Sequence, residues 1–131
     1  MAKLLKKVSN AYWVYYVNEA EAKKFDDSKV GKWMYFFKDN DFAAKICEKA
    51  VADGVVAEAK HSNAPDGVCC FYLHFDDKKA HKRCITYFLE NGLIRKLSLE
   101  SYTISRLSLM IRHETANMAT VLYLRSNSLI L

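Results

Sequence analysis

The chain has 131 residues, of which 51% are hydrophobic and 27% charged, and its formal net charge is +5. This length and composition predict one folded domain over residues 1–131 and exclude a disordered chain. No apolar run is long enough to cross a bilayer, and residues 1–7 lack the apolar segment of a signal peptide. We therefore expect a cytoplasmic protein whose surplus of positive charge weakly favours anionic partners.

Four segments predict β-strands because they are rich in aromatic and β-branched residues. They are residues 12–17, 32–37, 55–61 and 68–75. The short turn Asn63-Ala64-Pro65-Asp66-Gly67 joins the last two, so these should form an antiparallel hairpin. In the second strand, Trp33 shares a face with Tyr35 and Phe37. That face is too apolar for solvent, and we expect Trp33 in the core.

Two segments predict the principal helices. Residues 42–53 carry an apolar stripe at helical spacing, with Asp41 as the cap and Gly54 at the end. Residues 77–91 carry a second stripe, capped by Asp76 or Asp77 and closed by Asn91-Gly92. Residues 19–29 are polar and predict a loop, or a short helix over 19–24. Short connections and grouped helices together predict an α+β fold: a mainly antiparallel curved sheet with two principal helices on one face.

Three stretches resemble the basophilic-leukaemia-expressed protein family, which is poorly characterised. They are Gly31-Lys32-Trp33-Met34-Tyr35-Phe36-Phe37, Ala57-Glu58-Ala59-Lys60-His61-Ser62, and Gly67 to Leu93. The resemblance covers residues 11–95, about two thirds of the chain. It implies a fold like that of the cap-binding translation initiation factor. It carries no catalytic signature, and the cap-stacking tryptophans of that factor are not assigned to positions here.

Residues 97–131 differ in composition from the preceding core. All fifteen lysines lie at or before Lys96, and the tail has neither aspartate nor glycine. Similar bacterial proteins continue differently here, and residues 102–113 can be encoded by codons whose neighbouring frame spells the relatives' segment. The codons for Leu109-Met110-Ile111, for instance, permit Asp-Asp in that frame. We therefore hypothesise a one-base slip near residues 97–102. The alternative is a genuine, divergent tail with strands over 101–110 and 119–124.

A shifted frame would also place apolar side chains at positions never selected to face inward. Apolar side chains that are exposed to solvent promote association, so we expect the protein to self-associate through the tail. The residues concerned are Leu107, Leu109, Ile111, Leu122 and Leu124.

If both helices cover one face of the sheet, the other face is left for water or a ligand. Aromatic rings beside a lysine can stack bases while the cation binds a phosphate. Alternatively, these side chains pack beneath the tail or residues 19–29. The candidates are Trp13 and Tyr15 (or Tyr12 and Tyr16), with Glu58, Lys60, Tyr72 and His74.

A basic cluster at the start of the second helix, residues 78–83, is a further candidate. Lys82 and Arg83 could hold a phosphate at the helix N-terminus. Asp76 and Asp77 oppose that interpretation by neutralising the site, so the cluster is also explained as a solvated helix face.

We assign no catalytic or metal-binding residues and no cofactor from the sequence. The chain has no Cys-x-x-Cys pair, and no zinc spacing joins Cys69, Cys70, His74, His81 and Cys84. The cysteines, which include Cys47, should be buried, reduced thiols. Lys60, His61, His74 and His81 could serve phosphate chemistry, but no spacing demands it.

These observations favour a non-enzymatic binding module whose physiological role is open. Its ligand would be a nucleotide or single-stranded nucleic acid bound by an aromatic and basic sheet face. The alternative is a protein–protein interaction or inhibitor module with no nucleic-acid ligand.

Overall fold

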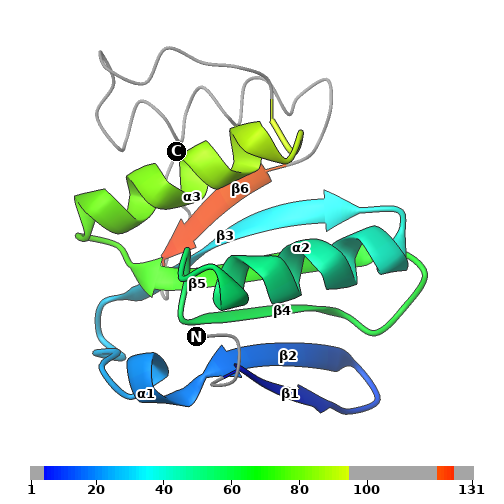
Figure 1. The fold of residues 1–131 in the computed structure, drawn as a ribbon, viewed down its shortest axis with the longest axis horizontal. Coiled ribbons are helices and arrows are strands. Elements are labelled where there is room, and N and C mark those ends of the chain that lie inside the picture. The colour runs from blue at the N-terminus through cyan, green and yellow to red at the C-terminus, as the bar shows by residue number, and fades with distance from the viewer. Residues whose placement is uncertain (1–4, 95–120, 126–131) are drawn as a thin grey trace.

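The computed structural model describes residues 5–94 and 121–125, the latter by their backbone. Six strands form one sheet in the order β1-β2-β4-β5-β3-β6, and every neighbouring pair is antiparallel. Helices α2 and α3 lie on the same face of this sheet (Figure 1). The predicted α+β fold is therefore confirmed. The strands are β1 Leu5–Ser9, β2 Trp13–Asn18, β3 Val30–Phe37, β4 Glu58–Ser62, β5 Gly67–His74 and β6 Val121–Arg125.

The three helices are α1 Glu19–Ala22, α2 Asn40–Ala52 and α3 Lys78–Glu90. Each of the two principal helices is followed by a glycine with a φ of +75°, Gly54 after α2 and Gly92 after α3. A residue with positive φ directly after a helix ends the helix, and glycine adopts this conformation with little loss of free energy. The predicted helix ends are therefore confirmed.

The cap of α2 differs from the prediction. Asp39, and not Asp41, accepts the backbone N–H groups of Asp41 and Phe42, at 3.0 and 3.3 Å. Both aspartates have suitable chemistry, but a cap needs non-helical backbone, and Asp39 has the extended φ of −130°. Asp77 caps α3, where its side chain accepts the N–H of Ala80 at 3.1 Å.

Strand β1 was not predicted from the sequence. Its residues Leu-Lys-Lys-Val-Ser pair with β2 along their whole length, from Leu5 opposite Asn18 to Ser9 opposite Val14. Most of the strand is exposed, so hydrophobic alternation does not mark it. Lysines on an edge strand discourage pairing with another chain.

The core lies between the sheet and the helices α2 and α3. Trp33 at its centre has no exposed surface, and Phe37 on the same strand face is 2% exposed. The prediction that Trp33 faces the core is confirmed. The apolar stripe of α2 is buried as predicted and consists of Ala43, Ile46, Cys47, Ala50 and Val51.

Helix α3 buries more than its predicted stripe. His81 has no exposed surface, so the segment 78–83 is not a uniformly solvated basic face. His81, Cys84, Ile85 and Phe88 follow the spacing i, i+3, i+4, i+7 of one helix side, and all four are buried.

The tail contributes β6, which pairs with β3 and sets Tyr123 opposite Trp33. This strand agrees with the one predicted over residues 119–124. The other predicted tail strand, over 101–110, lies outside the described residues, as do residues 97–102 and the apolar positions 107, 109 and 111. The frame-slip hypothesis therefore stays a prediction.

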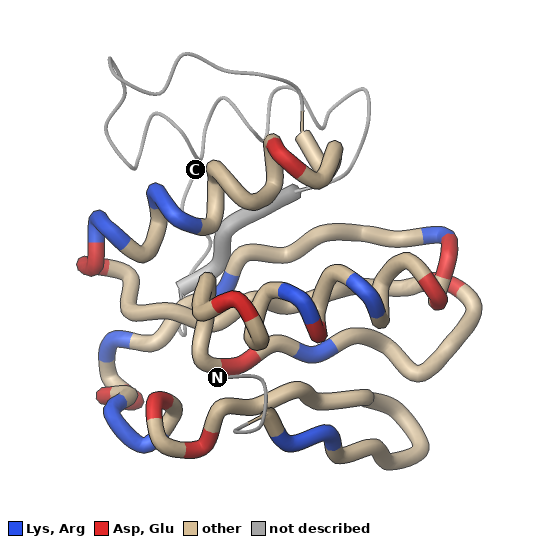
Figure 2. The backbone as a smooth tube through the Cα atoms, in the orientation of Figure 1, with Lys and Arg blue, Asp and Glu red and all other residues tan. Residues whose placement is uncertain are grey.

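The basic residues do not gather in one stretch of the chain. Lys and Arg occur on β1, α2 and α3, and acidic residues lie among them on α2 (Figure 2). Within residues 5–94 and 121–125, no helix is long and apolar enough to cross a membrane.

Candidate functional site

Trp13, Tyr15, Lys60 and Tyr72 come together on the sheet face that α2 and α3 leave uncovered. Their strands β2, β4 and β5 are neighbours in the sheet, and strand alternation points these side chains away from the helices. In the register, Tyr15 lies opposite Lys60, and Glu58, two residues before Lys60, lies opposite Tyr72. Trp13 and Tyr15 lie on this face, whereas Tyr16 is 2% exposed in the core and Tyr12, which is 77% exposed, precedes β2.

The ammonium of Lys60 sits among three aromatic rings. Its Nζ is 3.8 Å from the ring centroid of Trp13, 5.5 Å from that of Tyr15 and 6.0 Å from that of Tyr72. These distances are within the range of cation–π attraction. We call this group of four residues the Lys60 cage.

Partial burial shifts the pKa values of ionisable groups in and beside the Lys60 cage. Burial lowers the pKa of Lys60 from its usual 10.5 and raises the pKa of Glu58 above 4.5. Burial also raises the pKa of Tyr72 far above 10, which keeps its hydroxyl protonated. Lys32 lies opposite Tyr72 in the register and adds a second cation to this face.

His74 lies on the same strand as Tyr72 but is held by the segment after α1. Its Nε2 accepts the backbone N–H of Asp26 at 2.8 Å, and its ring meets that of Phe25 edge-on, with the centroids 5.4 Å apart. The structure therefore shows that His74 packs against residues 19–29, which is the alternative considered from the sequence.

Lys82 and Arg83 lie on α3 and so belong to the helix layer on the opposite side of the sheet from the Lys60 cage. Lys82 is exposed, and the Nε–H of Arg83 donates to the carbonyl oxygen of Val55 at 3.4 Å. The structure thus brings four of the seven predicted ligand residues together and places the other three elsewhere.

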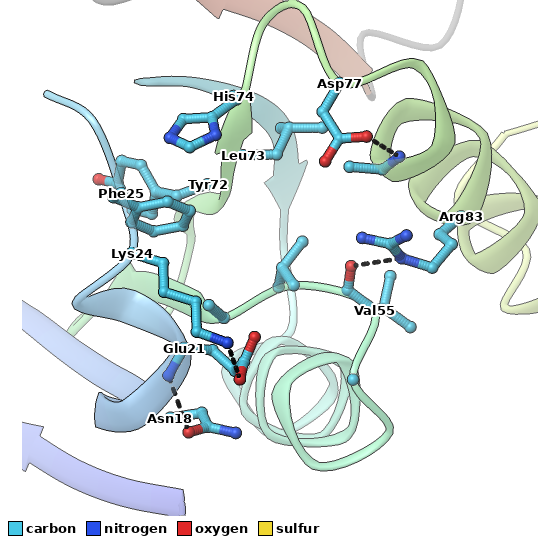
Figure 3. A pocket seen from close by; sticks show the side chains of 14 residues that line it. Asn18, Glu21, Lys24, Phe25, Val55, Tyr72, Leu73, His74, Asp77 and Arg83 are labelled. Carbon is cyan, nitrogen blue, oxygen red and sulfur yellow. Dashed lines mark hydrogen bonds and ion pairs between the residues drawn. The ribbon is translucent and has the colours of Figure 1, made fainter. Parts of the chain in front are cut away.

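A cavity of about 210 Å³ lies near the ends of β2 and β5 and the start of β4 (Figure 3). Segments far apart in the sequence line it, among them α1 with Phe25, the connection from α2 to β4, and the first turns of α3. We call it the edge cavity. Sequence reasoning missed it because no single segment carries its signature. Arg83 and His74 both line it, and Tyr72 borders it as well as the Lys60 cage.

The two buried histidines have hydrogen bonds inside the fold. His61 Nδ1–H donates to the carbonyl oxygen of Ser62 at 2.9 Å, and Nε2 accepts the hydroxyl of Tyr16 at 3.3 Å. His81 contacts Trp33 and Phe75 on the helix side of the sheet. Neither ring therefore lines the exposed face that carries Lys60.

The four cysteines are buried and form no disulfide. Burial raises the pKa of the Cys47, Cys70 and Cys84 thiols, that of Cys84 to about 12. Among the residues that the structure describes, no three His, Cys, Asp or Glu side chains are grouped so that they could hold a metal ion.

Comparison with protein families, with curated proteins and with solved structures finds no match to this chain. The resemblance to the basophilic-leukaemia-expressed family therefore stays a prediction.

Proposed function

We propose that this protein is a binding module for a nucleotide or single-stranded nucleic acid and that the Lys60 cage is its contact surface. The observation that carries the proposal is the position of Lys60 Nζ, 3.8 Å from the ring centroid of Trp13 and within 6.0 Å of two tyrosine ring centroids. A base can stack on such rings whatever its identity, and the ammonium can pair with the adjoining phosphate.

The charge on this face supports a single phosphate rather than a long backbone track. Lys32 and Lys60 are the two cations of the described face next to Tyr72, and Glu58 opposes them. We therefore expect a short site and a shallow dependence of affinity on salt. The proposed membership of the basophilic-leukaemia-expressed family is compatible with this module and adds no residue to it.

A protein-interaction module is the second candidate, and exposed apolar side chains favour it. Tyr12 is 77% exposed, Val8 45% and Phe36 43%. Val8 and Tyr12 belong to the hairpin of β1 and β2, whereas Phe36 lies on β3, which β4 and β5 separate from that hairpin. Exposed hydrophobic residues that lie together are typical of contact surfaces, so the hairpin is the favoured one. This function needs no phosphate, so it predicts binding that is insensitive to nuclease.

The first experiment is a pull-down from lysate with and without nuclease, followed by fluorescence anisotropy with a labelled oligonucleotide. Trp13→Ala should weaken binding by roughly 1–3 kcal/mol, the usual contribution of one stacked base. Lys60→Met keeps an unbranched side chain of similar size and removes its charge, and it should reduce the salt slope by about one. Lys45→Met, on the exposed side of α2, is the matched control.

Circular dichroism establishes that each variant is folded. Equal affinity of Lys60→Met and Lys45→Met would refute the cage as the contact surface. A partner that survives nuclease and depends on Tyr12 or Phe36 would instead support the protein-interaction module.

A further inference from the structure

We infer that the edge cavity binds a free α-amino acid with an apolar side chain. This site lies beside the proposed nucleotide surface and shares Tyr72 with it, but the inference rests on other residues. Its volume, about 210 Å³, is below the range of about 300–1,000 Å³ that drug-sized ligands occupy. A nucleotide is therefore too large for it, whereas an amino acid is of suitable size.

The charges of the lining residues favour a ligand that carries both signs. Glu21 and Asp77 are acidic and Lys24 and Arg83 are basic, so these four side chains carry no net charge together. Glu21 and Lys24 pair with each other at 3.0 Å. Asp77 and Arg83 remain, and neither forms an ion pair with another described residue.

Arg83 is oriented to bind a carboxylate. Its Nε–H donates to the carbonyl oxygen of Val55, which fixes the guanidinium plane, and the terminal nitrogens point into the edge cavity (Figure 3). A guanidinium fork binds a carboxylate through two parallel hydrogen bonds.

Asp77 is placed to accept from an ammonium. One of its carboxylate oxygens accepts the N–H of Ala80 at 3.1 Å and caps α3, which leaves the second oxygen available in the edge cavity. Asp77 caps α3 and Arg83 follows in its second turn, and both side chains line the cavity. The two charged groups therefore lie on the side of the cavity that α3 forms (Figure 3).

Part of the opposite wall is apolar, beside the polar side chains of Glu21, Lys24 and His74. Phe25 and Leu73 line the cavity across from Arg83, and Val56 contributes from the segment before β4 (Figure 3). A branched aliphatic side chain would bury apolar surface there, which favours its binding. A simple anion would lack this contact and would face the carboxylates of Glu21 and Asp77.

Isothermal titration calorimetry of the full chain with three ligands tests the inference. L-leucine carries both charges, L-leucinamide only the ammonium and 4-methylpentanoate only the carboxylate. We expect leucine to bind at least about tenfold more tightly than either analogue, since each lacks one charge-assisted contact. Equal binding of leucine and one analogue, or no saturable binding of leucine, would overturn the inference.

Two variants and one control identify the site. Arg83→Gln and Asp77→Asn should each weaken leucine binding about tenfold or more. Asparagine is as good a helix cap as aspartate, so Asp77→Asn keeps α3 intact. Lys82→Gln, on the neighbouring exposed position, should bind leucine as the wild type does. Weakening by Lys82→Gln equal to that by Arg83→Gln would overturn the assignment.

The same protein samples are also titrated with the labelled oligonucleotide. Trp13→Ala should affect only the oligonucleotide, and Arg83→Gln only leucine. Loss of one activity without the other thus distinguishes failure of this inference from failure of the proposed function.

Discussion

The indole Nε1–H of Trp33 donates a hydrogen bond to Nδ1 of His81 at 3.1 Å and joins β3 to α3 across 48 residues. His81 Nε2–H in turn donates to the carbonyl oxygen of Phe75 at 2.9 Å. These contacts require a neutral imidazole with its proton on Nε2. Both side chains have no exposed surface, so the pair links the two layers inside the core.

Trp33→Phe should destabilise the protein because it removes the donor to His81 while keeping an aromatic ring in place. We expect a loss of about 1–3 kcal/mol, and of roughly 3–5 kcal/mol for Trp33→Ala, where a cavity is added. Urea denaturation measures both losses. Trp13→Phe, on the half-buried opposite face, should cost less. If Trp33→Phe is as stable as the wild type, the hydrogen bond contributes nothing.

Stability should fall as the pH drops below about 6.5 because of His81. Burial lowers the pKa of His81 from its usual 6.5, although Asp76 and Asp77 oppose the shift. The unfolded chain therefore takes up this proton at a higher pH than the folded chain. The stabilisation is fully present above the unfolded pKa and is lost as the pH falls through the lowered one.

His81→Asn tests this, because asparagine can still accept from Trp33 but does not titrate. Urea midpoints at about pH 7.5 and about pH 5.5 should differ less in the variant than in the wild type. His74→Gln, outside the core, serves as the control. An equal pH response of wild type and His81→Asn would show that His81 is not the responsible group.

Gly67→Ala should destabilise the chain more than Gly54→Ala. Both positions have positive φ, +151° at Gly67 and +75° at Gly54. A Cβ at Gly54 meets open space, so the cost there is the backbone strain of about 1–2 kcal/mol. A Cβ at Gly67 would overlap the side chain of Ser62, whose Oγ accepts the N–H of Val68 at 2.9 Å. Equal losses in urea denaturation would contradict this.

The thiols should react only when the protein unfolds. All four cysteines are buried, and the raised thiol pKa values further reduce the thiolate fraction. Ellman's reagent should therefore give no fast phase in native buffer and full reaction in guanidinium chloride. The native rate should rise in the destabilised Trp33→Ala variant. A fast phase in the native wild type would mean that one thiol is accessible.

Replacing residues 102–113 by the segment that the neighbouring frame encodes should raise solubility. The reason is that the tail carries apolar residues at positions such as 107, 109 and 111, and exposed apolar side chains promote association. These positions lie outside the described part of the chain. Sedimentation velocity over a concentration series should show self-association of the wild type and less of it in the variant. Monomeric wild type at all concentrations would remove the main support for a frame slip.

Much of the sheet and of the Lys60 cage could be predicted because strand alternation is a local rule. Successive side chains of a strand point to opposite faces of the sheet, so Tyr72 could be assigned to the open face and Trp33 to the core without knowledge of the neighbouring strands. Whether Trp13, Lys60 and Tyr72 lie close together depends on the order of the strands in the sheet, and that order is a property of the whole chain. The sequence alone could therefore only suggest that they meet, and the structure shows it.

The features that were missed depend on distant segments or on weak local signals. His81 looked like part of a basic cluster because lysines flank it, although its helical spacing to Cys84 and Phe88 marks the buried side. The edge cavity draws on segments from Asn18 to Arg83, which no motif connects. Strand β1 carries lysines on both faces and pairs through its backbone, which sequence patterns do not record.

The place of β3 between β5 and β6 has a consequence during synthesis. Val30 pairs with His74 and Phe37 with Gly67, and β6 comes later still. Both neighbours of β3 therefore leave the ribosome long after it does. In the interval Trp33 and Phe37, the buried residues of that strand, have no sheet to join, and unpaired apolar strands are prone to aggregate. A nascent chain that ends before residue 67 is thus the form most in need of a chaperone.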